Sequence, residues 1–526
     1  MIRIREIALP PEHNPAQLGY EAARLLKIPN SKIRQLKIIR RSIDARKKPD
    51  VKVTYTIDVA VDGNENKILK QSGCKRAAIA PISYYKPPKS PVVPEKRPVV
   101  VGFGPAGMFC AYVLALAGWK PIVLERGADA ATRHEKVEKF WATGQLDAKT
   151  NVQFGEGGAG TFSDGKLNTG VNNPRIGWIL EQFVKFGAAE DILFDAKPHV
   201  GTDVLLNVVQ NLRKKIIELG GEVHFNAQVV NFRSENGCLT ALELCDGRVI
   251  ACDKAILAIG HSARDTFEML NQRGISMEAK PFAMGVRIEH KQSLIDKAQY
   301  GCENPALPPA DYKLVKHLED GTVYTFCMCP GGYVVAAASD AGGVVTNGMS
   351  YADRAGENAN AALLVTVNPK DFPGDGPLSG MYWQRSIEEA AYEVGGGGYL
   401  APAQTVGDFL AGRPSIGPGS VMPTYRPGVA WCDLQKVLPQ KIADSLKEAL
   451  PQLDGNLKGF ASPDAVLTAP ETRSSSPVRI LRGEDKQSVS LRGLYPCGEG
   501  AGYAGGIMSA AIDGIMTAEA ILSNRR

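Results

Sequence analysis

Three glycines that follow a run of apolar residues carry the first chemical signal in this chain. The stretch Val99–Ala111 reads VVVGFGPAGMFCA, in which Gly102, Gly104 and Gly107 have the spacing G-x-G-x-x-G. In a strand–turn–helix unit the first glycine permits a tight turn, the second lets the backbone approach a pyrophosphate, and the third lets the helix pack closely on the strand. The phosphates then lie at a helix N-terminus, where free N–H groups favour an anion. The spacing predicts a dinucleotide site.

A carboxylate follows at the place where a ribose would be held. The apolar run Pro121–Leu124 predicts a second strand, and Glu125 comes directly after it, 23 residues past Gly102. In dinucleotide-binding folds, an acidic residue about 20 residues past the first glycine binds the ribose hydroxyls. An ordinary strand–helix turn without a ligand is the alternative. The two signals together favour the dinucleotide site.

Two further glycine-rich segments suit the same ligand. The loop Asn151–Gly170 reads NVQFGEGGAGTFSDGKLNTG, and its backbone N–H groups, hydroxyls and lysine predict cofactor contact. A flexible surface loop is the alternative for this segment. Near the C-terminus, Leu494–Pro496 predicts a short strand, and Gly505-Gly506 then opens a helix. We expect the N-terminus of that helix to point into the crevice.

The composition is that of an ordinary globular protein. The 526 residues are 44% hydrophobic and 22% charged, and this length predicts two to four domains. The long uncharged stretch Pro98–Trp119 contains the fingerprint, so we interpret it as a buried βα unit and expect no membrane span. The N-terminus lacks the apolar region of a signal peptide, which predicts a cytoplasmic location. Ten cysteines without a C-x-x-C pair indicate neither a disulfide framework nor a metal site. Cys327 and Cys329 form a C-x-C in a predicted strand, where alternation would place two buried thiols on one face.

Charge divides the chain unevenly. Residues 1–97 hold 21 Lys and Arg against 9 Asp and Glu, whereas the remaining residues hold 40 against 47. A basic surface of this kind suits a nucleic acid or an acidic protein partner. We favour a solvated basic face that docks on the acidic remainder of the chain, with nucleic-acid binding as the alternative.

The elements between the motifs predict an α/β chain of several parts. A βαββ pattern opens the chain, and six prolines from Pro81 to Pro98 predict an extended spacer. One strand is predicted over 222–231, and hairpin signals at Asn236-Gly237 and Asp246-Gly247 then predict a three-stranded β-meander. Further along, helices are predicted near residues 382–394 and 434–450. The predicted parts are a small basic α+β domain (1–80), a Pro-rich linker (81–97), the first part of a Rossmann-like domain with a β-meander (98–280), an inserted α+β substrate domain (281–476) and the C-terminal part of the Rossmann-like domain (477–526).

With these motifs in place, the sequence resembles a known family. The segments VVVGFGPAGMFCAYVLA, FGEGGAGTFSDGKL, ETRSSSPVRI and LYPCGEGAGYAGGI resemble FAD-dependent oxidoreductases with the glutathione-reductase-type FAD fold. They are more closely similar to a bacterial group of largely uncharacterised FAD-dependent dehydrogenases. The resemblance implies that residues 98–280 and 477–526 form a FAD-binding domain.

The resemblance also implies a role for individual residues. Val229 would hold the adenine edge, and Gly498 and Glu499 stand where this fold has a Gly-Asp pair that binds the ribityl chain. Gly506 and Ile507 would present N–H groups to the flavin's pyrimidine side, which stabilises the reduced anion. The full predicted cofactor-binding set is Gly102, Gly104, Pro105, Ala106, Gly107, Glu125, Arg126, Gly158, Gly160, Thr161, Ser163, Lys166, Val229, Gly260, Gly498, Glu499, Gly505, Gly506 and Ile507.

Catalytic residues are suggested by position rather than by a motif. Arg473 is suited to orient an anionic substrate bidentately, and Tyr503 or His261 to supply a proton; a structural role is the alternative for each. The sequence has no second fingerprint for a nicotinamide cofactor. NAD(P)H, if it is the electron donor, would therefore dock transiently in the substrate cavity.

The leading hypothesis is a FAD-dependent oxidoreductase that passes a hydride between flavin N5 and a small organic substrate. Two alternatives remain open: an RNA-associated flavoprotein that uses the basic N-terminal domain, and a flavin redox sensor that signals to a protein. Neither the substrate, the reaction direction nor the oligomeric state follows from the sequence.

Overall fold

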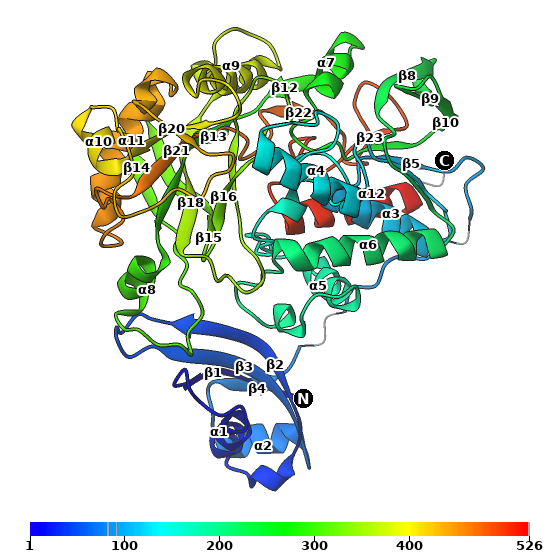
Figure 1. Cartoon of the computed structure of the whole chain (residues 1–526). Helices are drawn as coiled ribbons and strands as arrows, with labels where there is room; N and C mark the ends of the chain where they lie inside the picture. The colour runs from blue at the N-terminus through cyan, green and yellow to red at the C-terminus, as the bar shows by residue number, and fades with distance from the viewer. Residues whose placement is uncertain (82–83, 91, 524–526) are drawn as a thin grey trace.

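The computed structural model describes residues 1–81, 84–90 and 92–523. Figure 1 shows a large body and a small N-terminal module that projects from one side of it. Residues 82–83 and 91, in the predicted linker, and residues 524–526, in the predicted C-terminal part, lie outside the described residues. None of the helices in the described part of the chain is long and apolar enough to cross a membrane.

The N-terminal module, residues 1–81, is a four-stranded antiparallel sheet with two helices on one face. The strand order is β2-β3-β1-β4. Alternation along β3 turns Val53, Tyr55 and Ile57 toward the helices, where they are buried. The predicted βαββ pattern is confirmed; a short polar helix and a fourth strand follow it. The elements are β1 (Ile2–Leu9), α1 (Gln17–Leu26), β2 (Ile33–Asp44), β3 (Lys52–Val61), α2 (Glu65–Ser72) and β4 (Ala77–Ile79).

A five-stranded parallel sheet carries the fingerprint at its centre. The order is β23-β11-β5-β6-β7, and every neighbouring pair is parallel. Strand β23 comes from the C-terminal region, so the end of the chain returns to the sheet on which the fingerprint lies (Figure 1). The strands are β5 (Val99–Val101), β6 (Ile122–Leu124), β7 (Glu222–His224), β11 (Ala255–Leu257) and β23 (Leu494–Pro496).

Two nearly charge-free helices pack together against this sheet. Helix α3 (Pro105–Leu116) follows the fingerprint, which confirms the buried βα unit predicted for the uncharged stretch. Helix α12 (Ile507–Ser523) lies beside it, and Gly514 makes the close approach possible because a Cβ there would meet the Ala106 carbonyl. Further helices of this part are α4 (Ala130–Thr143), α5 (Arg175–Lys185), α6 (Thr202–Glu218) and α7 (Arg264–Gln272).

The predicted meander is present, but the strand that leads into it is divided. Strands β8 (Val229–Glu235), β9 (Cys238–Leu244) and β10 (Val249–Ala251) form a sheet in the order β10-β9-β8. We predicted one strand over 222–231, whereas β7 ends at His224 and β8 begins at Val229. The left-handed backbone of Asn226, with a φ of 54°, turns the chain out of the parallel sheet at that point.

A seven-stranded sheet forms the other half of the body. Its order is β14-β15-β18-β13-β21-β19-β20, antiparallel except for the pair β19–β20. Strand β13 is buried along almost its whole length. The strands are β13 (Phe282–Lys291), β14 (Val315–Leu318), β15 (Gly321–Cys329), β18 (Asn358–Val367), β19 (Ala401–Thr405), β20 (Val429–Trp431) and β21 (Val466–Glu471).

Helices and short strand pairs complete this half. The predicted helix over 434–450 begins later, after Pro439, because the preceding residues form a short 3₁₀ turn instead. The helices are α8 (Gln292–Tyr300), α9 (Ser379–Val394), α10 (Val406–Ala411) and α11 (Gln440–Asp454), and the two strand pairs are β12 (Met277–Ala279) with β22 (Val478–Ile480), and β16 (Tyr333–Ala336) with β17 (Thr346–Met349).

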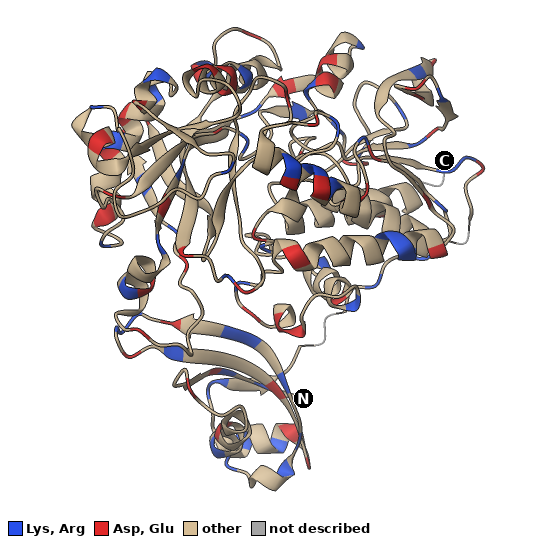
Figure 2. Ribbon diagram, in the orientation of Figure 1, with Lys and Arg blue, Asp and Glu red and all other residues tan. Residues whose placement is uncertain are grey.

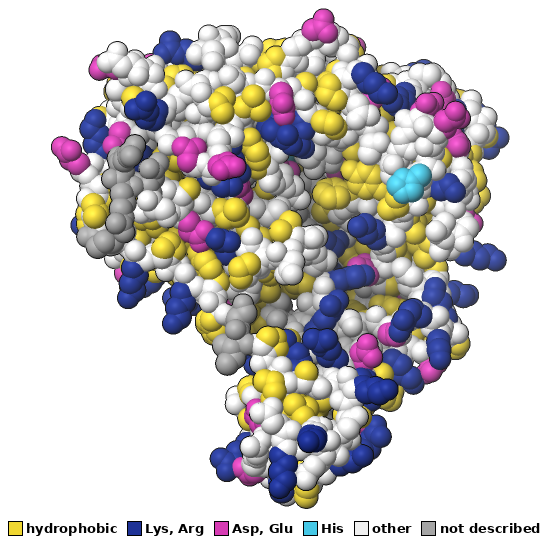
Figure 3. Space-filling model, turned by 180° about the vertical axis from the view of Figure 1, so that it is seen from behind, with side chains coloured by type: hydrophobic (Ala, Val, Ile, Leu, Met, Phe, Trp, Pro, Cys, Tyr) yellow, Lys and Arg dark blue, Asp and Glu magenta, His cyan; other side chains and the backbone are white. Residues whose placement is uncertain are grey.

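The N-terminal module contacts the body through the edge strand β2. The guanidinium of Arg41 donates two hydrogen bonds to Asp195, at 2.6 and 2.8 Å, and its backbone pairs with Phe194 and Ala196. Figure 2 shows Lys and Arg along the strands of the module, and from behind they crowd the module and the adjoining body surface (Figure 3). At this contact, a basic residue of the module pairs with an acidic residue of the body.

Candidate functional site

A cavity of about 700 Å³ lies between the parallel sheet and the seven-stranded sheet. It opens beyond the carboxyl ends of β5, β6 and β11, where ligands bind in open α/β sheets. Its wall continues from one sheet to the other. It includes, from the fingerprint side to the seven-stranded sheet, Glu125, Arg126, Val229, Gly104, Pro105, Gly158, Gly160, Gly505, Gly506, Ile507, Glu499, His261, Lys166, Tyr312, Cys327 and Asn347.

The fingerprint glycines lie where the backbone of neighbouring segments leaves little or no room for a side chain. Gly102 has a φ of 96°, and a Cβ there would collide with the Ala258 carbonyl of the neighbouring strand. Gly107 lies behind the cavity wall, where a Cβ would collide with the carbonyl of Gly102. Gly104 faces Gly158 of the glycine-rich loop across the cavity wall. A side chain at Gly102 or Gly107 would therefore disrupt the strand–turn–helix packing, whereas one at Gly104 would enter the space between the turn and the loop.

Glu125 joins the fingerprint turn to the glycine-rich loop. Its buried carboxylate accepts backbone N–H groups from Phe103 at 2.8 Å and from Gly127 and Gly155 at 2.9 Å. A carboxylate offers about four acceptor sites, so one remains for a ribose hydroxyl. The ribose contact predicted for Glu125 stays a prediction.

A buried arginine that sequence reasoning missed holds the glycine-rich loop in place. The Arg133 guanidinium donates to the carbonyls of Asn151 and Val152 at 2.8 Å and of Glu156 at 2.7 Å. Burial lowers its pKa to about 10, so it stays charged at neutral pH. A signal was present, because Arg133 falls on the same helical stripe of α4 as the buried Val137 and Phe140.

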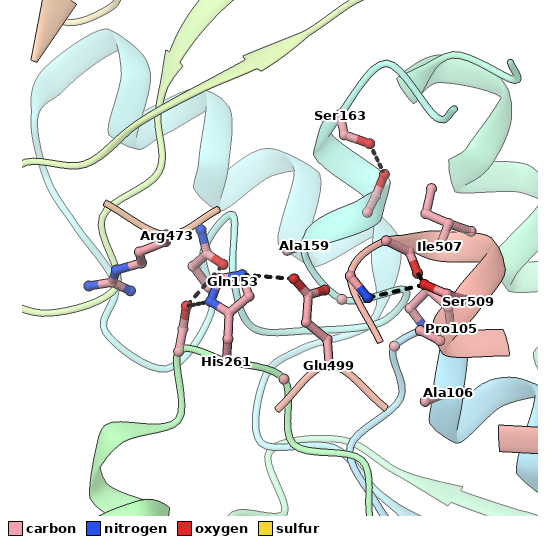
Figure 4. A pocket seen from close by; sticks show the side chains of 18 of the residues that line it. Pro105, Ala106, Gln153, Ala159, Ser163, His261, Arg473, Glu499, Ile507 and Ser509 are labelled. Atoms are coloured by element: carbon pink, nitrogen blue, oxygen red, sulfur yellow. Dashed lines mark hydrogen bonds and ion pairs between the residues drawn. The ribbon is translucent and has the colours of Figure 1, made fainter. Parts of the chain in front are cut away.

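The N-terminus of α12 borders the middle of the cavity. Ser509 accepts a hydrogen bond from the Gly505 N–H at 3.1 Å, and Figure 4 shows this contact beside Ile507 and Pro105. A Cβ at Gly505 or Gly506 would meet nothing within 4 Å, since it would point into open space. The first-turn N–H groups of a helix have no acceptor within the helix, so this end offers donors to a ligand.

Not every predicted cofactor residue lies on the wall. Gly107, Thr161 and Gly498 lie behind it, and the other predicted cofactor residues line it. Gly498 donates its N–H to Asp513 at 2.8 Å, and Arg482 in turn holds Asp513 with bonds of 2.8 and 2.6 Å. Gly498 therefore positions the segment after β23 rather than facing the cavity.

The three predicted catalytic residues have different surroundings. Tyr503 lies outside the wall, where its hydroxyl donates to the Ile480 carbonyl at 3.2 Å. Arg473 reaches the wall, but its guanidinium is held by Glu388 at 2.7 and 3.0 Å and by Asp340 at 3.1 Å. These contacts engage both hydrogen-bonding edges of the guanidinium. In Figure 4 the Arg473 side chain points away from Glu499. His261 faces the cavity.

A chain of four polar side chains fixes the protonation of His261 (Figure 4). The Gln153 amide donates to the Ala337 carbonyl at 3.2 Å, so its oxygen accepts from the Ser262 hydroxyl at 3.1 Å. The Ser262 oxygen then accepts from His261 Nδ1, 3.0 Å away. His261 Nε2 is left as an acceptor, 3.9 Å from Glu499 Oε1.

Burial gives this pair of groups unusual acidities. It raises the pKa of Glu499 to about 7, and it lowers the pKa of His261 to about 3 with help from the cations of Arg473 and Arg264. Near neutral pH, His261 is a neutral acceptor and Glu499 can hold or release a proton. Sequence reasoning missed Gln153 and Ser262, because neither stands in a recognisable motif.

The predicted C-x-C pair departs from simple alternation. Strand β15 bulges between Phe326 and Cys329, and Cys327 takes a φ of 42°. Cys327 consequently lines the cavity, whereas Cys329 is fully buried. Cys327 is only partly buried, so the prediction of two buried thiols holds for Cys329 alone. Among the described residues, no cluster of side chains is arranged to hold a metal ion.

Comparison with known proteins identifies a relative that covers the whole chain. An uncharacterised protein of Clostridium beijerinckii is 48% identical over 99% of this chain and 98% of its own length. The chain belongs to the same family as that protein. Family models match it in two places: "FAD-dependent protein, C-terminal domain-like" over residues 281–474, and a domain of unknown function, DUF8436, over residues 1–60.

Solved structures resemble this member of the family only distantly. Glycine oxidase from Bacillus cereus is 12% identical, covering 82% of this chain and 96% of its own, with a TM-score of 0.33. L-proline dehydrogenase from P. horikoshii is 11% identical, covering 82% and 94%, with a TM-score of 0.33. L-amino acid deaminase from Proteus vulgaris is 10% identical, covering 84% and 97%, with a TM-score of 0.34. We draw no conclusion about substrate from likenesses this weak.

The family match and the cavity agree on the cofactor. The matched domain is that of FAD-dependent proteins, and the fingerprint, the glycine-lined wall and the helix end at Gly505 suit an extended dinucleotide. This family member is a FAD-dependent protein. Its body is a mixed α/β structure that combines a parallel and an antiparallel sheet.

Proposed function

We propose that the protein transfers a hydride between flavin N5 and an organic substrate, with FAD bound along the cavity. In this proposal the adenosine end lies at Glu125 and Val229, the pyrophosphate lies at Gly104 and Gly158, and the flavin reaches the α12 N-terminus. The fold would be of the glutathione-reductase type, with residues 281–476 as the substrate domain. The observation that carries the proposal is the continuity of one cavity from the fingerprint to the seven-stranded sheet.

Bound FAD would supply two-electron chemistry, and the chain would supply position and protons. The N–H groups at the start of α12 favour negative charge, which suits the reduced flavin. His261 Nε2 accepts, and Glu499 holds a proton near neutral pH, so this pair is suited to exchange a proton with the substrate.

The electron donor is part of the proposal. The parallel sheet carries a single fingerprint turn, and we expect NAD(P)H to enter the substrate cavity transiently rather than to occupy a site of its own. A flavin that NADH or NADPH reduces slowly at high concentration, without saturation, would fit this arrangement.

The test is to load the purified protein with FAD and follow the flavin spectrum without oxygen. We expect one FAD per chain, reduction by a chemical or nicotinamide donor, and reoxidation by members of an acceptor panel. A protein that takes up no FAD contradicts the cofactor assignment. A flavin that binds but exchanges electrons with no small molecule contradicts the enzymatic proposal and favours a sensor.

A further inference from the structure

The end of the cavity near the seven-stranded sheet holds a lysine ammonium that the protein itself does not satisfy. Lys166 Nζ is enclosed and donates to no acceptor in the described part of the chain. The nearest carboxylate oxygen belongs to Asp164, at 3.6 Å, which is beyond hydrogen-bonding distance. An enclosed ammonium that makes no hydrogen bond is costly, so a site of this kind calls for a ligand.

The carboxylate of Asp164 is already taken by another cation. It is fully buried, and Arg354 donates to its two oxygens at 3.1 and 2.6 Å. Two cations, Lys166 and Arg354, therefore face one carboxylate. The other buried arginine nearby, Arg287, is held by its own carboxylate, Glu471, at 3.0 and 3.2 Å. Of these three cations, Lys166 is the one that shares its carboxylate and makes no hydrogen bond within the described residues.

A second donor without a partner lines the same cavity. Tyr312 is 5% exposed, and within the described residues its hydroxyl makes no hydrogen bond. Burial raises its pKa, so it remains a neutral donor at any physiological pH. A buried hydroxyl and a buried ammonium on one cavity wall are complementary to an oxyanion.

The pKa values of two other titratable groups in the cavity reflect its positive potential and its burial. Burial raises the pKa of Glu499, which weakens it as a counter-charge near neutral pH. The hydrogen bond from Cys329 and the cations of Arg287 and Lys166 lower the pKa of the Cys327 thiol. The positive potential that favours a thiolate at Cys327 also favours a bound anion.

We propose that the substrate of the flavin reaction carries an oxyanion, a carboxylate or a phosphate, which binds Lys166 Nζ and the Tyr312 hydroxyl. This proposal rests on the proposed function, because the substrate must lie beside the flavin. It moves the anion contact from Arg473, whose guanidinium is engaged by Glu388 and Asp340, to Lys166. It also assigns Lys166 to the substrate rather than to the cofactor.

The test uses FAD-loaded protein and records the visible flavin spectrum while small anions are added. Acetate, benzoate and succinate probe a carboxylate site, and inorganic phosphate probes a phosphate site. We expect a saturable spectral change with one of the two groups, which identifies the source of the oxyanion. Sodium chloride at matched ionic strength is the control for a general salt effect.

Three variants locate the site. Lys166→Met should weaken anion binding about 10-fold or more, because a hydrogen bond to a charged group is lost. Tyr312→Phe removes only an oxygen that makes no hydrogen bond to any described residue, so it should fold normally and weaken binding several-fold. Lys214→Met, at an exposed position on α6, should leave binding unchanged.

The outcomes separate this proposal from the cofactor assignment. Full FAD occupancy without a saturable anion effect overturns the oxyanion site and leaves the flavin function standing. Anion binding that is equal in the parent, Lys166→Met and Tyr312→Phe overturns it as well. Lower FAD affinity in Lys166→Met, with unchanged anion binding, would return Lys166 to the cofactor. Failure to take up any FAD would instead contradict the proposed function.

Discussion

The Glu499→Gln variant tests the protonation of the His261–Glu499 pair, because its effect on stability should depend on pH in a defined way. The structure raises the pKa of Glu499 from 4.5 to about 7 by burial. This rise corresponds to about 3 kcal/mol in favour of the protonated form of the folded protein. Below pH 4.5 the carboxyl is protonated in both the folded and the unfolded chain. In that range the difference in stability between the variant and the parent should therefore not change with pH.

The difference should grow as the pH rises. Between pH 4.5 and 7 the unfolded carboxyl ionises freely while the buried one resists, which destabilises the parent progressively. Above pH 7 the full cost of about 3 kcal/mol is present in the parent and absent from Glu499→Gln. Other buried carboxyls, such as Glu289 and Glu471, are common to both proteins and cancel in the comparison.

The assay is the melting temperature of the two apoproteins measured side by side from pH 4 to pH 9. We expect the melting temperature of Glu499→Gln, relative to the parent, to climb by a few degrees between pH 5 and 8 and then level off. A relative melting temperature that stays constant over this range would refute the reasoning, because Glu499 would then ionise as an exposed carboxyl does.

Three further predictions follow from packing. Arg133→Met leaves three buried carbonyls without donors, and each unsatisfied carbonyl costs about 1–3 kcal/mol of folding free energy. We therefore expect a large drop in melting temperature, measured by thermal shift, and loss of bound FAD, measured by absorbance. Gly505→Leu fills open cavity space, so it should keep the parent's melting temperature but weaken FAD binding at least 10-fold; unchanged FAD affinity would contradict it. Arg41→Ala removes a half-exposed ion pair, so limited proteolysis near Asp195 should quicken about 2- to 5-fold, while an unchanged rate would show that this contact does not secure the module.

The local elements were predictable because each one carries its own signal. The fingerprint turn, the uncharged helix α3 and the hairpins of the meander each follow from spacing or turn chemistry within a few residues. The helix α2 was missed because its eight residues are mostly polar and present no apolar stripe. The break at Asn226 was missed because a single left-handed residue leaves no pattern in the sequence.

The site was predictable only in its cofactor half. Spacing along the chain placed Gly104 and Glu125, but the partners of Arg473 come from residues more than eighty positions away. Whether a guanidinium is free or engaged depends on which strands and helices pack together. That packing cannot be read from residues so far apart in the sequence. The Gln153–Ser262–His261 chain and the pairing of Asp164 with Arg354 rather than with Lys166 are long-range facts of the same kind.

We propose that one cavity holds FAD from the fingerprint to the start of α12. The most direct measurement is titration of FAD into the apoprotein and into Gly505→Leu, with ADP titrated in parallel. We expect the parent to bind one FAD per chain and Gly505→Leu to bind FAD much more weakly. Both proteins should bind ADP equally, because the substitution blocks only the flavin end of the cavity. FAD bound equally tightly by the parent and Gly505→Leu, or no FAD bound at all, would contradict it.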